Sequence, residues 1–573
     1  MILYNKFMEK SIQEGIFNMN LTVKNVSSLE KIRDKKDIPE FNLERMCAVG
    51  GESISYQIAV CSENSMDFVV SVCSPLEDYI TLYSVNDVIM DRPFMPEHTG
   101  DDFLTDTPGI MPDLLIPLEK SNNHMRVFNR GTALWVKIDI PKDFKPGEYR
   151  IEVKLDASSS LQNKDEQWRI TQVMNVDVLG MNMPEQKLIF TQWFHTDCIA
   201  SVHNVKIYSE EHWEWIDKYM AMASSIGINM ILTPVITPPL DTGIGKMRPC
   251  TQLVMIEKKD DKYSFDFSLL KHWISLCKKN NIKYYEISHL FSQWGLKYSP
   301  NIMVTENSVE KLMFGWHIEA QNPLYKEFLI QFLPALTECL KDEGILEACY
   351  FHISDEPVTA HLENYRYAYE IIKPLIGNAK IMDAISHVDF CETGMIQVPV
   401  TSIYAIDEFL EKKFDNQWAY YCCCEGIKTP NRFISMPSYR NRVIGLLLYK
   451  YNIEGFLQWG YNFYFSSLSE FPVNPYVTTS AGCAFPSGDP FSVYPGNDDV
   501  LPSLRAVIFK EALQDIELCR KLESYIGKES VVELIEKEAG MEITFTNYPR
   551  NNEFLHRVNE LVKKEIVKYS DEL

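Results

Sequence analysis

The chain has 573 residues, more than one ordinary domain holds, so two or three domains are expected. Hydrophobic residues make up 46% of it and aromatic residues 12%, a composition that supports large cores and argues against disorder. The net charge of −23 argues against nucleic acid or an anionic membrane as a partner, because both require a basic surface.

The N-terminal segment, residues 1–20, mixes charged residues such as Lys6 and Glu9 into its hydrophobic ones and so has no signal-peptide core. No apolar run approaches the ~20 residues of a membrane span. The 14 cysteines show neither zinc-ligand spacing nor a disulfide framework. The run 422–424 consists of three cysteines and is read as buried thiols inside an apolar strand. These features predict a cytoplasmic protein without a metal or other cofactor.

Residues 21–182 have the pattern of a β-sandwich domain. Ile54, Tyr56, Ile58 and Val60 alternate with polar residues, as in a half-buried strand. The apolar alternations at 136–140 and 149–155 flank a Pro-Gly turn, which is a hairpin-like signal. Nothing in this region indicates catalysis, so a structural or sugar-positioning role is expected. Residues 180–186 read as the linker that follows.

Residues 186–525 alternate between apolar strands and amphipathic helices, which is the pattern of a parallel α/β domain. Eight such units over roughly 300 residues match a (β/α)₈ barrel of the TIM type. A helix from about Ser503 to Leu522 and a C-terminal helical extension, 526–573, complete the chain. The eight strands are predicted at 187–197, 228–235, 282–289, 348–354, 379–383, 402–406, 418–424 and 454–460.

Three helices between these strands carry recognisable signals. One presents Trp213, Ile216, Met220 and Ala223 on one face and ends at Gly227. In another, Asp266 can cap a helix that buries Leu270, Trp273, Ile274 and Cys277. The third opens at Asn322-Pro323 and leads into the fourth strand.

The fourth strand is the centre of the functional prediction. It ends in two adjacent carboxylates, Asp355 and Glu356, followed by Pro357. Proline cannot donate to a sheet and restricts the residue before it, so the strand should stop here. The carboxyl end of a parallel barrel strand is where barrel enzymes place their chemistry. The alternative is a solvated loop pair or a helix N-cap, which Asp-Glu-Pro also suits.

Other strand ends add acids, histidines and aromatic residues to the same rim. Hydroxyl-binding polar groups, apolar ring faces and carboxylates together are what a neutral carbohydrate pocket needs. Each residue has a plainer explanation: His289 or His352 as a satisfied buried imidazole, Asp407 as a helix cap, and Trp459 as barrel filling. The coincidence across strands favours a pocket. The candidates at the rim are His195, Asp197, Glu286, His289, Asp383, Trp459, Tyr461 and Asn462.

Several spaced motifs resemble glycoside hydrolase family 123. They are Trp-Phe-His-Thr-Asp-Cys-Ile-Ala at 193–200, Ser-His-Leu-Phe-Ser-Gln-Trp-Gly at 288–295 and Ser-Asp-Glu-Pro at 354–357. Segments 455–464 and 488–496 are similar to the family as well. The resemblance covers most of residues 187–522, and the front domain resembles the family's β-sandwich more loosely. Several motifs in the right order are more specific than any one of them.

The resemblance implies a barrel glycosidase that acts on β-linked N-acetylgalactosamine by substrate-assisted catalysis. It implies that Asp355 orients the substrate's 2-acetamido group and that Glu356 is the general acid/base. Trp459 would form an apolar wall of the sugar subsite, Tyr461 and Asn462 would supply polar contacts, and His195, Asp197, Glu286, His289 and Asp383 would be hydroxyl ligands. Consecutive strand residues point to opposite faces, so both acids can serve one pocket only if the backbone twists between them. We predict that twist.

The substrate is expected to be a small glycoside or oligosaccharide. Two alternatives stay open: a glycosidase for another sugar with the same barrel, and an inactive carbohydrate-binding protein. Nucleotide binding is disfavoured because Thr-Gly-Ile-Gly-Lys at 242–246 lacks the spacing of a phosphate loop. A metal is not implied, because no His/carboxylate set has ligand spacing.

Overall fold

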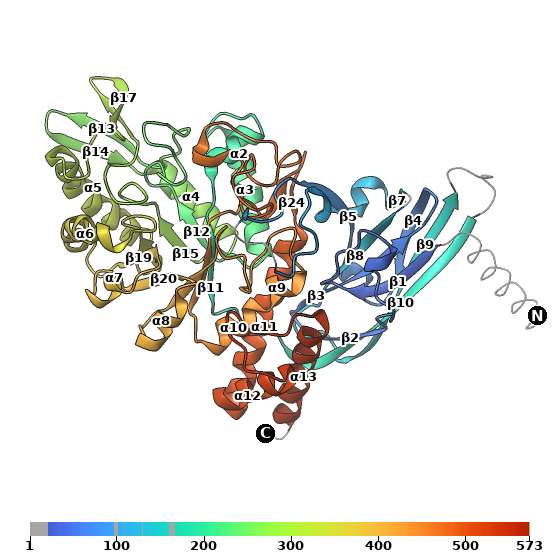
Figure 1. Ribbon diagram of the computed structural model, residues 1–573. Helices are drawn as coiled ribbons and strands as arrows, with labels where there is room; N and C mark the ends of the chain where they lie inside the picture. Colours follow the sequence, from blue (N-terminus) through green and yellow to red (C-terminus); the bar gives the residue numbers. More distant parts are fainter. Residues whose placement is uncertain (1–20, 97–100, 129, 160–166, 572–573) are drawn as a thin grey trace, which may run out of the picture.

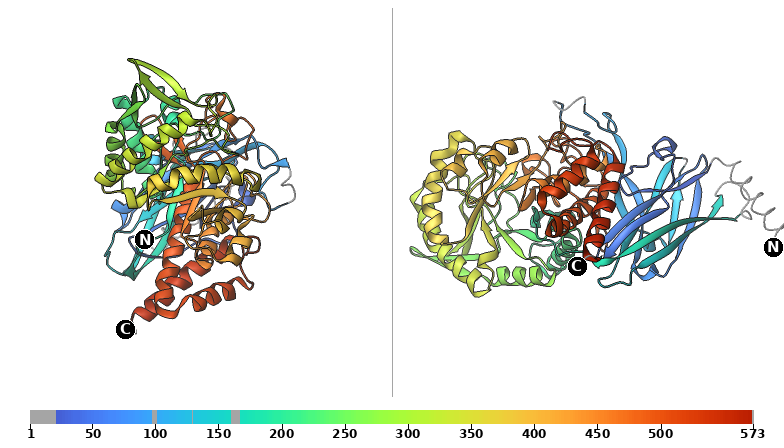
Figure 2. Two further views of the ribbon diagram at one scale, coloured as in Figure 1. Left: turned by 90° about the vertical axis from the view of Figure 1, so that its left-hand side faces the viewer. Right: turned by 90° about the horizontal axis from the view of Figure 1, so that it is seen from below.

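The computed structural model describes residues 21–96, 101–128, 130–159 and 167–571. The predicted N-terminal segment, 1–20, lies outside the described residues. A closed barrel occupies one end of the molecule and two β-sheets the other, as Figure 1 shows. Seen from below, the C-terminal helices lie between these two parts (Figure 2).

The described part of the N-terminal region forms two five-stranded sheets with a shared core. Tyr56 and Ile58 from the first sheet and Ile151 and Val153 from the second belong to one buried cluster. The first sheet has the order β1 (Thr22–Ser27), β3 (Ser53–Cys61), β8 (Gly131–Asp139), β5 (Ile80–Met90), β6 (Gly109–Pro117). The second has the order β2 (Arg45–Gly50), β10 (Gln167–Asn182), β9 (Gly147–Ser159), β4 (Met66–Cys73), β7 (His124–Val127).

Two local predictions for this region are wrong. Strand β3 is buried along its whole length rather than on one face, because its second face packs against the rest of the molecule. Ala59 joins the large cluster that includes the barrel, and Ser53 exchanges backbone hydrogen bonds with the side chain of Gln514. The Pro146-Gly147 turn does not close a hairpin, because β8 belongs to the first sheet and β9 to the second.

Buried ion pairs also join the first region to the C-terminal part of the chain. Arg505 contacts Asp113 at 2.8 Å, and Lys563 contacts Glu52 at 2.6 Å. All four side chains are at most 2% exposed. A charge this deeply buried is tolerated only when it is paired, so each pair depends on the two parts staying docked.

In the continuous stretch 167–571, eight parallel strands close into a barrel in chain order. Seven strands overlap their predicted segments; the sixth, Val398–Ser402, meets its predicted segment only at Ser402, because Ile406 already begins a helix. The seventh strand stops at Tyr420, before the three cysteines. The strands are β11 (Ile189–Gln192), β12 (Met230–Thr233), β15 (Tyr284–Ile287), β18 (Cys349–Phe351), β19 (Lys380–Ile385), β20 (Val398–Ser402), β21 (Trp418–Tyr420) and β22 (Gly455–Gln458).

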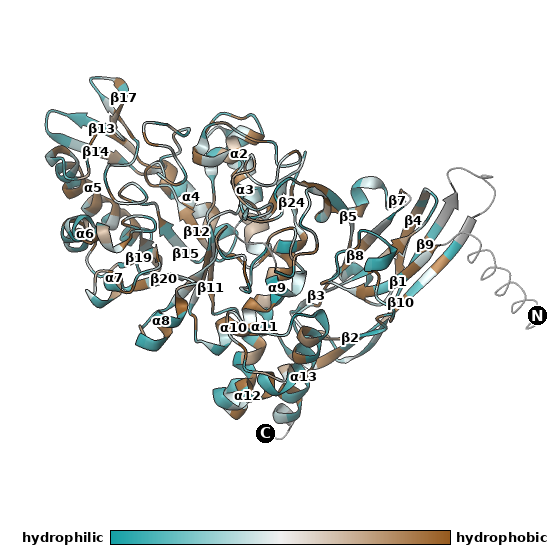
Figure 3. Ribbon diagram, in the orientation of Figure 1, coloured by the Kyte–Doolittle hydropathy of each residue, from teal (hydrophilic) through white to brown (hydrophobic). Residues whose placement is uncertain are grey.

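Helices cover the outside of the barrel, and the three predicted from their signals are present. Asp266 accepts a hydrogen bond from the Ser268 amide at the start of α4, and Asn322 caps α5. In Figure 3, α8 is largely hydrophilic on its outer surface. The helices are α2 (Thr196–Val202), α3 (Glu210–Ser225), α4 (Ser268–Lys279), α5 (Pro323–Asp342), α6 (Leu362–Ile376), α7 (Asp389–Glu392), α8 (Ile406–Lys412), α9 (Ser438–Arg442), α10 (Ile444–Lys450) and α11 (Leu504–Ile526).

Two additions to the barrel were not predicted. Loops after β12 and β15 form a four-stranded sheet, and a two-stranded sheet follows β22. The first consists of β14 (Lys262–Asp266), β13 (Met255–Lys259), β16 (Ile302–Glu306) and β17 (Val309–Phe314); the second consists of β23 (Val493–Pro495) and β24 (Val500–Pro502). Their strands are short and interrupted by turns, which leaves little periodicity to detect.

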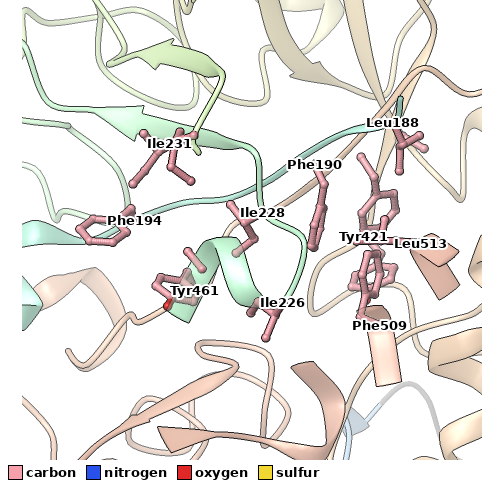
Figure 4. Close-up of a cluster of buried hydrophobic side chains, with 14 of the residues drawn as sticks. Leu188, Phe190, Phe194, Ile226, Ile228, Ile231, Tyr421, Tyr461, Phe509 and Leu513 are labelled. Carbon is pink, nitrogen blue, oxygen red and sulfur yellow. The ribbon is translucent and has the colours of Figure 1, made fainter. Parts of the chain in front are cut away.

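Helix α11 packs directly on the barrel. Phe509 stacks on Phe190 of β11 with ring centroids 4.5 Å apart, and Tyr421 lies beside them (Figure 4). Helices α12 (Lys528–Ala539) and α13 (Asn552–Asp571) follow it. No helix in the part of the chain that the structure describes combines the length and apolarity of a membrane span.

Candidate active site

A cavity of about 620 Å³ opens at the carboxyl ends of the barrel strands. Its lining residues lie at the ends of the eight strands or in the loops that follow them, which is the usual location of the site in this fold. Its lining includes Trp193, His195, Leu240, Asp241, Gln293, Trp294, Asp355, Glu356, Ser386, His387, Ser402, Tyr404, Tyr420, Cys422, Cys423, Cys424, Glu425, Leu457, Trp459 and Phe485.

The predicted backbone twist lies at the acid pair. Glu356 has a φ of +43°, in the left-handed region that non-glycine residues rarely occupy. The Trp294 amide donates to the carbonyl of Asp355 at 3.1 Å and holds the corner. Because of the twist, Asp355 and Glu356 both line the cavity. Backbone held in a sparsely populated conformation recurs at active sites.

Burial makes both carboxyls of the pair reluctant to ionise. Burial, and then the negative charge of Glu356, raise the pKa of Asp355 well above its usual value. Burial also raises the pKa of Glu356, although the Tyr420 hydroxyl donates to its Oε1 at 2.7 Å and opposes that rise. Among the described residues, no hydrogen bond involves the carboxyl oxygens of Asp355. The pair therefore retains a proton more readily than exposed carboxyls do.

Two other predicted site residues, Glu286 and Asp383, hold His352 inside the barrel. Its Nε2 lies 2.7 Å from Glu286 and its Nδ1 lies 2.9 Å from Asp383. Burial opposes a charge on this ring, but the two carboxylates outweigh it and raise the pKa of His352 to about 9. The resulting imidazolium lowers the pKa of Asp355. None of the three lines the cavity; their polar atoms are committed to one another.

Further hydrogen bonds complete this network. Glu286 also accepts from the Thr191 hydroxyl at 2.7 Å and the Trp193 indole at 2.6 Å, and Asp383 accepts from the Tyr365 hydroxyl at 2.6 Å. Such a fully bonded buried network fixes side-chain positions. Asp383 is therefore part of a structural network behind the cavity.

His289 stacks on His352 with ring centroids 4.1 Å apart. It is completely buried, does not line the cavity, and neither ring nitrogen has a hydrogen-bond partner among the described residues. Burial and the neighbouring His352 lower the pKa of His289 well below its usual value, so it is neutral. His352 is a satisfied buried imidazole, and His289 is a buried one without partners.

His195 lines the cavity, and hydrogen bonds with neighbouring residues fix its ring and its backbone. Its Nε2 donates to the Trp459 carbonyl at 3.0 Å and its Nδ1 accepts from Arg248 at 3.2 Å. Burial and the Arg248 charge lower the pKa of His195 to about 3. Asp197 forms a buried bidentate pair with Arg248, and Asn462 bonds the backbone N–H and C=O of His195. Asp197 and Asn462 themselves lie outside the cavity lining.

Trp459 and Tyr461 occupy different environments despite their proximity in sequence. Trp459 lines the cavity, contacts the rings of Phe463 and Phe485, and donates from its indole to Asp489 at 3.0 Å. Tyr461 is fully buried outside the lining, and its hydroxyl donates to the Tyr219 carbonyl at 2.8 Å. The predicted polar contact from Tyr461 to a sugar is therefore not possible in this geometry.

Three cavity residues of clear chemical interest were missed from the sequence. Tyr420 ends β21 and donates to Glu356; the prediction of a strand to residue 424 placed it inside the strand. Asp241 follows β12 in a loop, and burial raises its pKa to about 6. Trp294 is 50% exposed, with a φ of +54°, in a loop where Gly295 and Leu296 also have positive φ. Loop residues have no periodicity that could reveal their direction. Of the three, Trp294 alone lies inside one of the family-like motifs, at 288–295.

The three cysteines do not lie inside a strand, contrary to the prediction. They follow β21 in a turn that lines the cavity, with Cys422 and Cys423 half-buried and Cys424 exposed. Glu425, next to them, accepts from the Ser402 hydroxyl, and burial raises its pKa to about 7. Their sulfurs form one of two sets, within the described residues, of potential metal-ligand atoms that lie within 4.8 Å of one another. The other set is His289, His352 and Asp383, two of whose members are already bonded.

A parallel barrel with two carboxyls and aromatic walls at its mouth is an arrangement typical of glycoside hydrolases. Residues 193–522 match the family described as "Glycoside hydrolase 123, catalytic domain". The match covers more than half of the chain, and the chain belongs to glycoside hydrolase family 123. Comparison with curated proteins gives no match.

Among solved structures, a family 123 glycoside hydrolase from Clostridium perfringens, studied for glycolipid glycan hydrolysis, aligns with a TM-score of 0.72 and 16% identity. The alignment covers 96% of this chain and 99% of that chain, so the likeness extends over the N-terminal sheets. A family 5 mannosidase from Rhizomucor miehei gives a TM-score of 0.33 at 14% identity, covering 57% of this chain and 93% of that one. A score this low does not establish a shared fold.

Proposed function

We propose that this glycoside hydrolase is a retaining β-N-acetylgalactosaminidase that uses the substrate's own acetamido group as the nucleophile. The observation that carries the proposal is the corner at Glu356, whose positive φ brings two sequence neighbours into one cavity. A conventional retaining pair needs its carboxyls on opposite sides of the sugar, about 5 Å apart. Asp355 and Glu356 both reach the cavity from the end of one strand. That placement suits a mechanism in which one carboxyl acts on the leaving group and the other on the acetamido group.

Glu356 is the proposed general acid and base. Burial raises its pKa, so Glu356 holds its proton to higher pH than an exposed glutamate does, and its bond from Tyr420 fixes one carboxyl oxygen. It would protonate the glycosidic oxygen as the bond breaks. After the leaving group departs, the same carboxylate would take a proton from the water that opens the cyclised intermediate.

Asp355 is the proposed partner of the acetamido N–H. As the acetamido carbonyl oxygen closes on the anomeric carbon, positive charge develops on that nitrogen, and a carboxylate beside it stabilises the transition state. Its oxygens have no bond to any described residue, which leaves them available for the substrate. The His352 cation favours the ionised form of Asp355, so the Glu286–His352–Asp383 network has a positioning and electrostatic role.

The proposed substrate is the terminal sugar of a small glycoside or of a glycan. The Clostridium enzyme was studied for the hydrolysis of glycolipid glycans, and a lipid-linked glycan is one candidate for this chain too. The cavity has room for a sugar with part of its aglycone, and Trp459 would supply the apolar wall beneath the ring. We propose that the N-terminal sheets form a β-sandwich that supports the barrel, since neither contributes to the cavity lining.

Two alternatives are tested by the same experiment. A glycosidase for another sugar would share the barrel and the acid pair, and a carbohydrate-binding protein would share the cavity without turnover. Retention of both Asp355 and Glu356 in the cavity favours an enzyme over a binder, because binding alone does not need a proton donor beside a second acid.

The test is release of the aryl group from a panel of β-glycosides that includes N-acetylgalactosamine, N-acetylglucosamine, galactose and glucose. Cleavage is expected for the acetamido sugars, with galactosamine preferred, and proton NMR of the first product should show retained configuration. Cleavage restricted to sugars without the acetamido group, or an inverted product, would exclude the mechanism. Binding without release from any member would favour the carbohydrate-binding alternative.

A further inference from the structure

The three consecutive cysteines 422–424 gather on one side of a turn. In an extended strand, alternate side chains point to opposite faces, so three successive sulfurs could not meet. Here the Glu425 amide donates to the Cys422 carbonyl at 3.3 Å and closes a turn. As a result the three sulfurs all lie within 4.8 Å of one another.

Hydrogen bonds to its backbone hold the turn in place, and these bonds do not use the sulfurs. The Cys422 amide donates to the Glu425 carboxylate at 2.8 Å. The side-chain amide of Asn431, which is buried, donates to the carbonyls of Cys422 at 2.9 Å and Glu425 at 2.7 Å. The thiols are thus presented by a fixed backbone, and a ligand that binds them does not have to order the loop first.

The sulfur spacing fits a tetrahedral soft cation. Two sulfurs that each lie about 2.3 Å from a zinc ion at a tetrahedral angle are about 3.8 Å apart. Cys423 Sγ and Cys424 Sγ are 3.8 Å apart. None of the three cysteines is in a disulfide. Thiolate sulfur is the ligand that selects zinc and other thiophilic ions over magnesium or calcium.

We propose that Cys422, Cys423 and Cys424 form a binding site for one thiophilic cation of the Zn²⁺ type at the wall of the active-site cavity. Binding replaces the thiol protons with three sulfur–metal bonds and releases the protons to solvent, with no change of oxidation state. Three protein ligands leave the fourth position open to water. The same cavity holds Glu356, so the bound cation occupies space and adds positive charge where a substrate would sit.

The consequence is inhibition of the hydrolase by thiophilic ions. A cation bound to the cysteines would compete with the part of the substrate that lies along this wall. This part of the inference rests on the hydrolase activity; the binding site itself does not. The two are therefore measured separately.

Binding is tested with Cd²⁺, whose bonds to thiolates give a charge-transfer absorbance in the ultraviolet. The full-length chain is reduced, freed of reductant without oxygen and titrated, and Zn²⁺ is then added as a competitor. We expect one strongly bound Cd²⁺ that only a large molar excess of Zn²⁺ displaces, because the softer ion binds thiolates more tightly. The signal should be lost in the Cys422→Ser/Cys423→Ser/Cys424→Ser variant and kept in Cys73→Ser, which removes an exposed cysteine of β4.

Two outcomes of this titration would overturn the site. One is an unchanged strong signal in the triple variant. The other is a reduced wild-type chain that shows no charge-transfer absorbance when Cd²⁺ is added. If the triple variant unfolds at a lower temperature than wild type, Cys423→Ser alone serves instead, with the same loss of strong binding expected.

Inhibition is measured as the ratio of hydrolysis rates with and without Zn²⁺ in each variant. Wild type and Cys73→Ser should lose activity on addition of Zn²⁺, while the triple variant should keep its own basal rate. Zinc inhibition that persists in the triple variant would overturn the inhibitory role. If no glycoside of the panel is cleaved, the proposed function fails while the cadmium titration still decides the site.

Discussion

The barrel holds two groups of carboxyls that the same kind of sequence signal predicted, and their surroundings differ. Glu286 and Asp383 accept hydrogen bonds from His352, Trp193, Tyr365 and other neighbours, and neither lines the cavity. Asp355 lines the cavity, and no hydrogen bond among the described residues involves its carboxyl oxygens. Glu356 lines it with one bond, from Tyr420.

The difference separates residues that build the site from residues that act in it. A carboxylate whose lone pairs are already used by the protein has little capacity left for a substrate. A carboxyl in the cavity wall that makes few hydrogen bonds to the protein has a raised pKa and can still bind a substrate. The comparison predicts that changes at the first group reduce stability and that changes at the second reduce turnover.

The largest expected effect is that of Glu356→Gln. It should keep the fold and lower turnover by about 10²–10⁴-fold, because the proton donor is lost. Substrates with good leaving groups need less proton donation and should lose less. Steady-state rates on activated and unactivated aryl glycosides measure this, with the thermal midpoint as a check of folding. An equal loss on both substrates would show that Glu356 is not the acid.

Asp383→Asn should act on stability. It breaks a buried contact to the His352 cation, and removing one partner of a buried pair costs about 3–5 kcal/mol. Denaturant unfolding measures the loss, and Asp78→Asn, at an exposed acid of the N-terminal region, is the matched control. A variant of unchanged stability that has lost substrate binding would place Asp383 among the sugar ligands after all.

Asp355→Asn should lower kcat by about 10²–10³-fold with little change in KM, because the charge that it stabilises develops only in the transition state. A thiazoline that mimics the cyclised intermediate should inhibit the wild type strongly and the variant weakly. The result that would contradict this assignment is a raised KM at normal kcat. A sugar covalently attached to a carboxylate would contradict the mechanism itself.

Trp459→Ala should weaken inhibitor binding by about 1–3 kcal/mol through lost ring contact. Its half-buried ring also touches Phe463 and Phe485, so part of the change will lower the thermal midpoint. Trp213→Ala, at a half-buried tryptophan of α3 outside the cavity lining, controls for loss of packing alone. Unchanged affinity together with a lower midpoint would assign Trp459 to packing.

The smallest expected effect is a pH shift in Tyr420→Phe. The hydrogen bond from Tyr420 lowers the pKa of Glu356, so its removal raises that pKa further. An acid with a higher pKa stays protonated to higher pH, and the basic limb of the kcat/KM profile should move upward. Tyr404→Phe, a cavity tyrosine without a bond to Glu356, should leave the limb in place. Movement in the opposite direction would contradict the assignment.

The sequence was sufficient for the barrel because its strands are apolar runs separated by helices with clear caps. Seven of the eight strands overlap their predicted segments, and the corner at Glu356 has the twist that the adjacent acids required. The error at the sixth strand has a simple cause. Ile403 and Ile406 continue the apolar run past Ser402, although the chain has already turned toward α8.

The sequence could not separate the cavity wall from the network behind it. Glu286 and Glu356 are both acids near strand ends. Only the structure shows that Glu286 is already hydrogen-bonded to Trp193 and His352. Asp241 and Trp294 lie in loops, where position along the chain says little about direction. The cysteine run was misplaced because its apolar neighbours extend the strand pattern beyond Tyr420.

The docking of the N-terminal sheets has a consequence for how the molecule melts. The pairs Arg505–Asp113 and Lys563–Glu52 cross between the sheets and the C-terminal helices and are almost completely hidden from water. Separating the two parts would expose these charges and the second face of β3 together. Neither part is therefore expected to stay folded once the other has unfolded. Heat capacity measured in a calorimeter should therefore show a single transition, and the barrel expressed without residues 21–182 should not remain in solution.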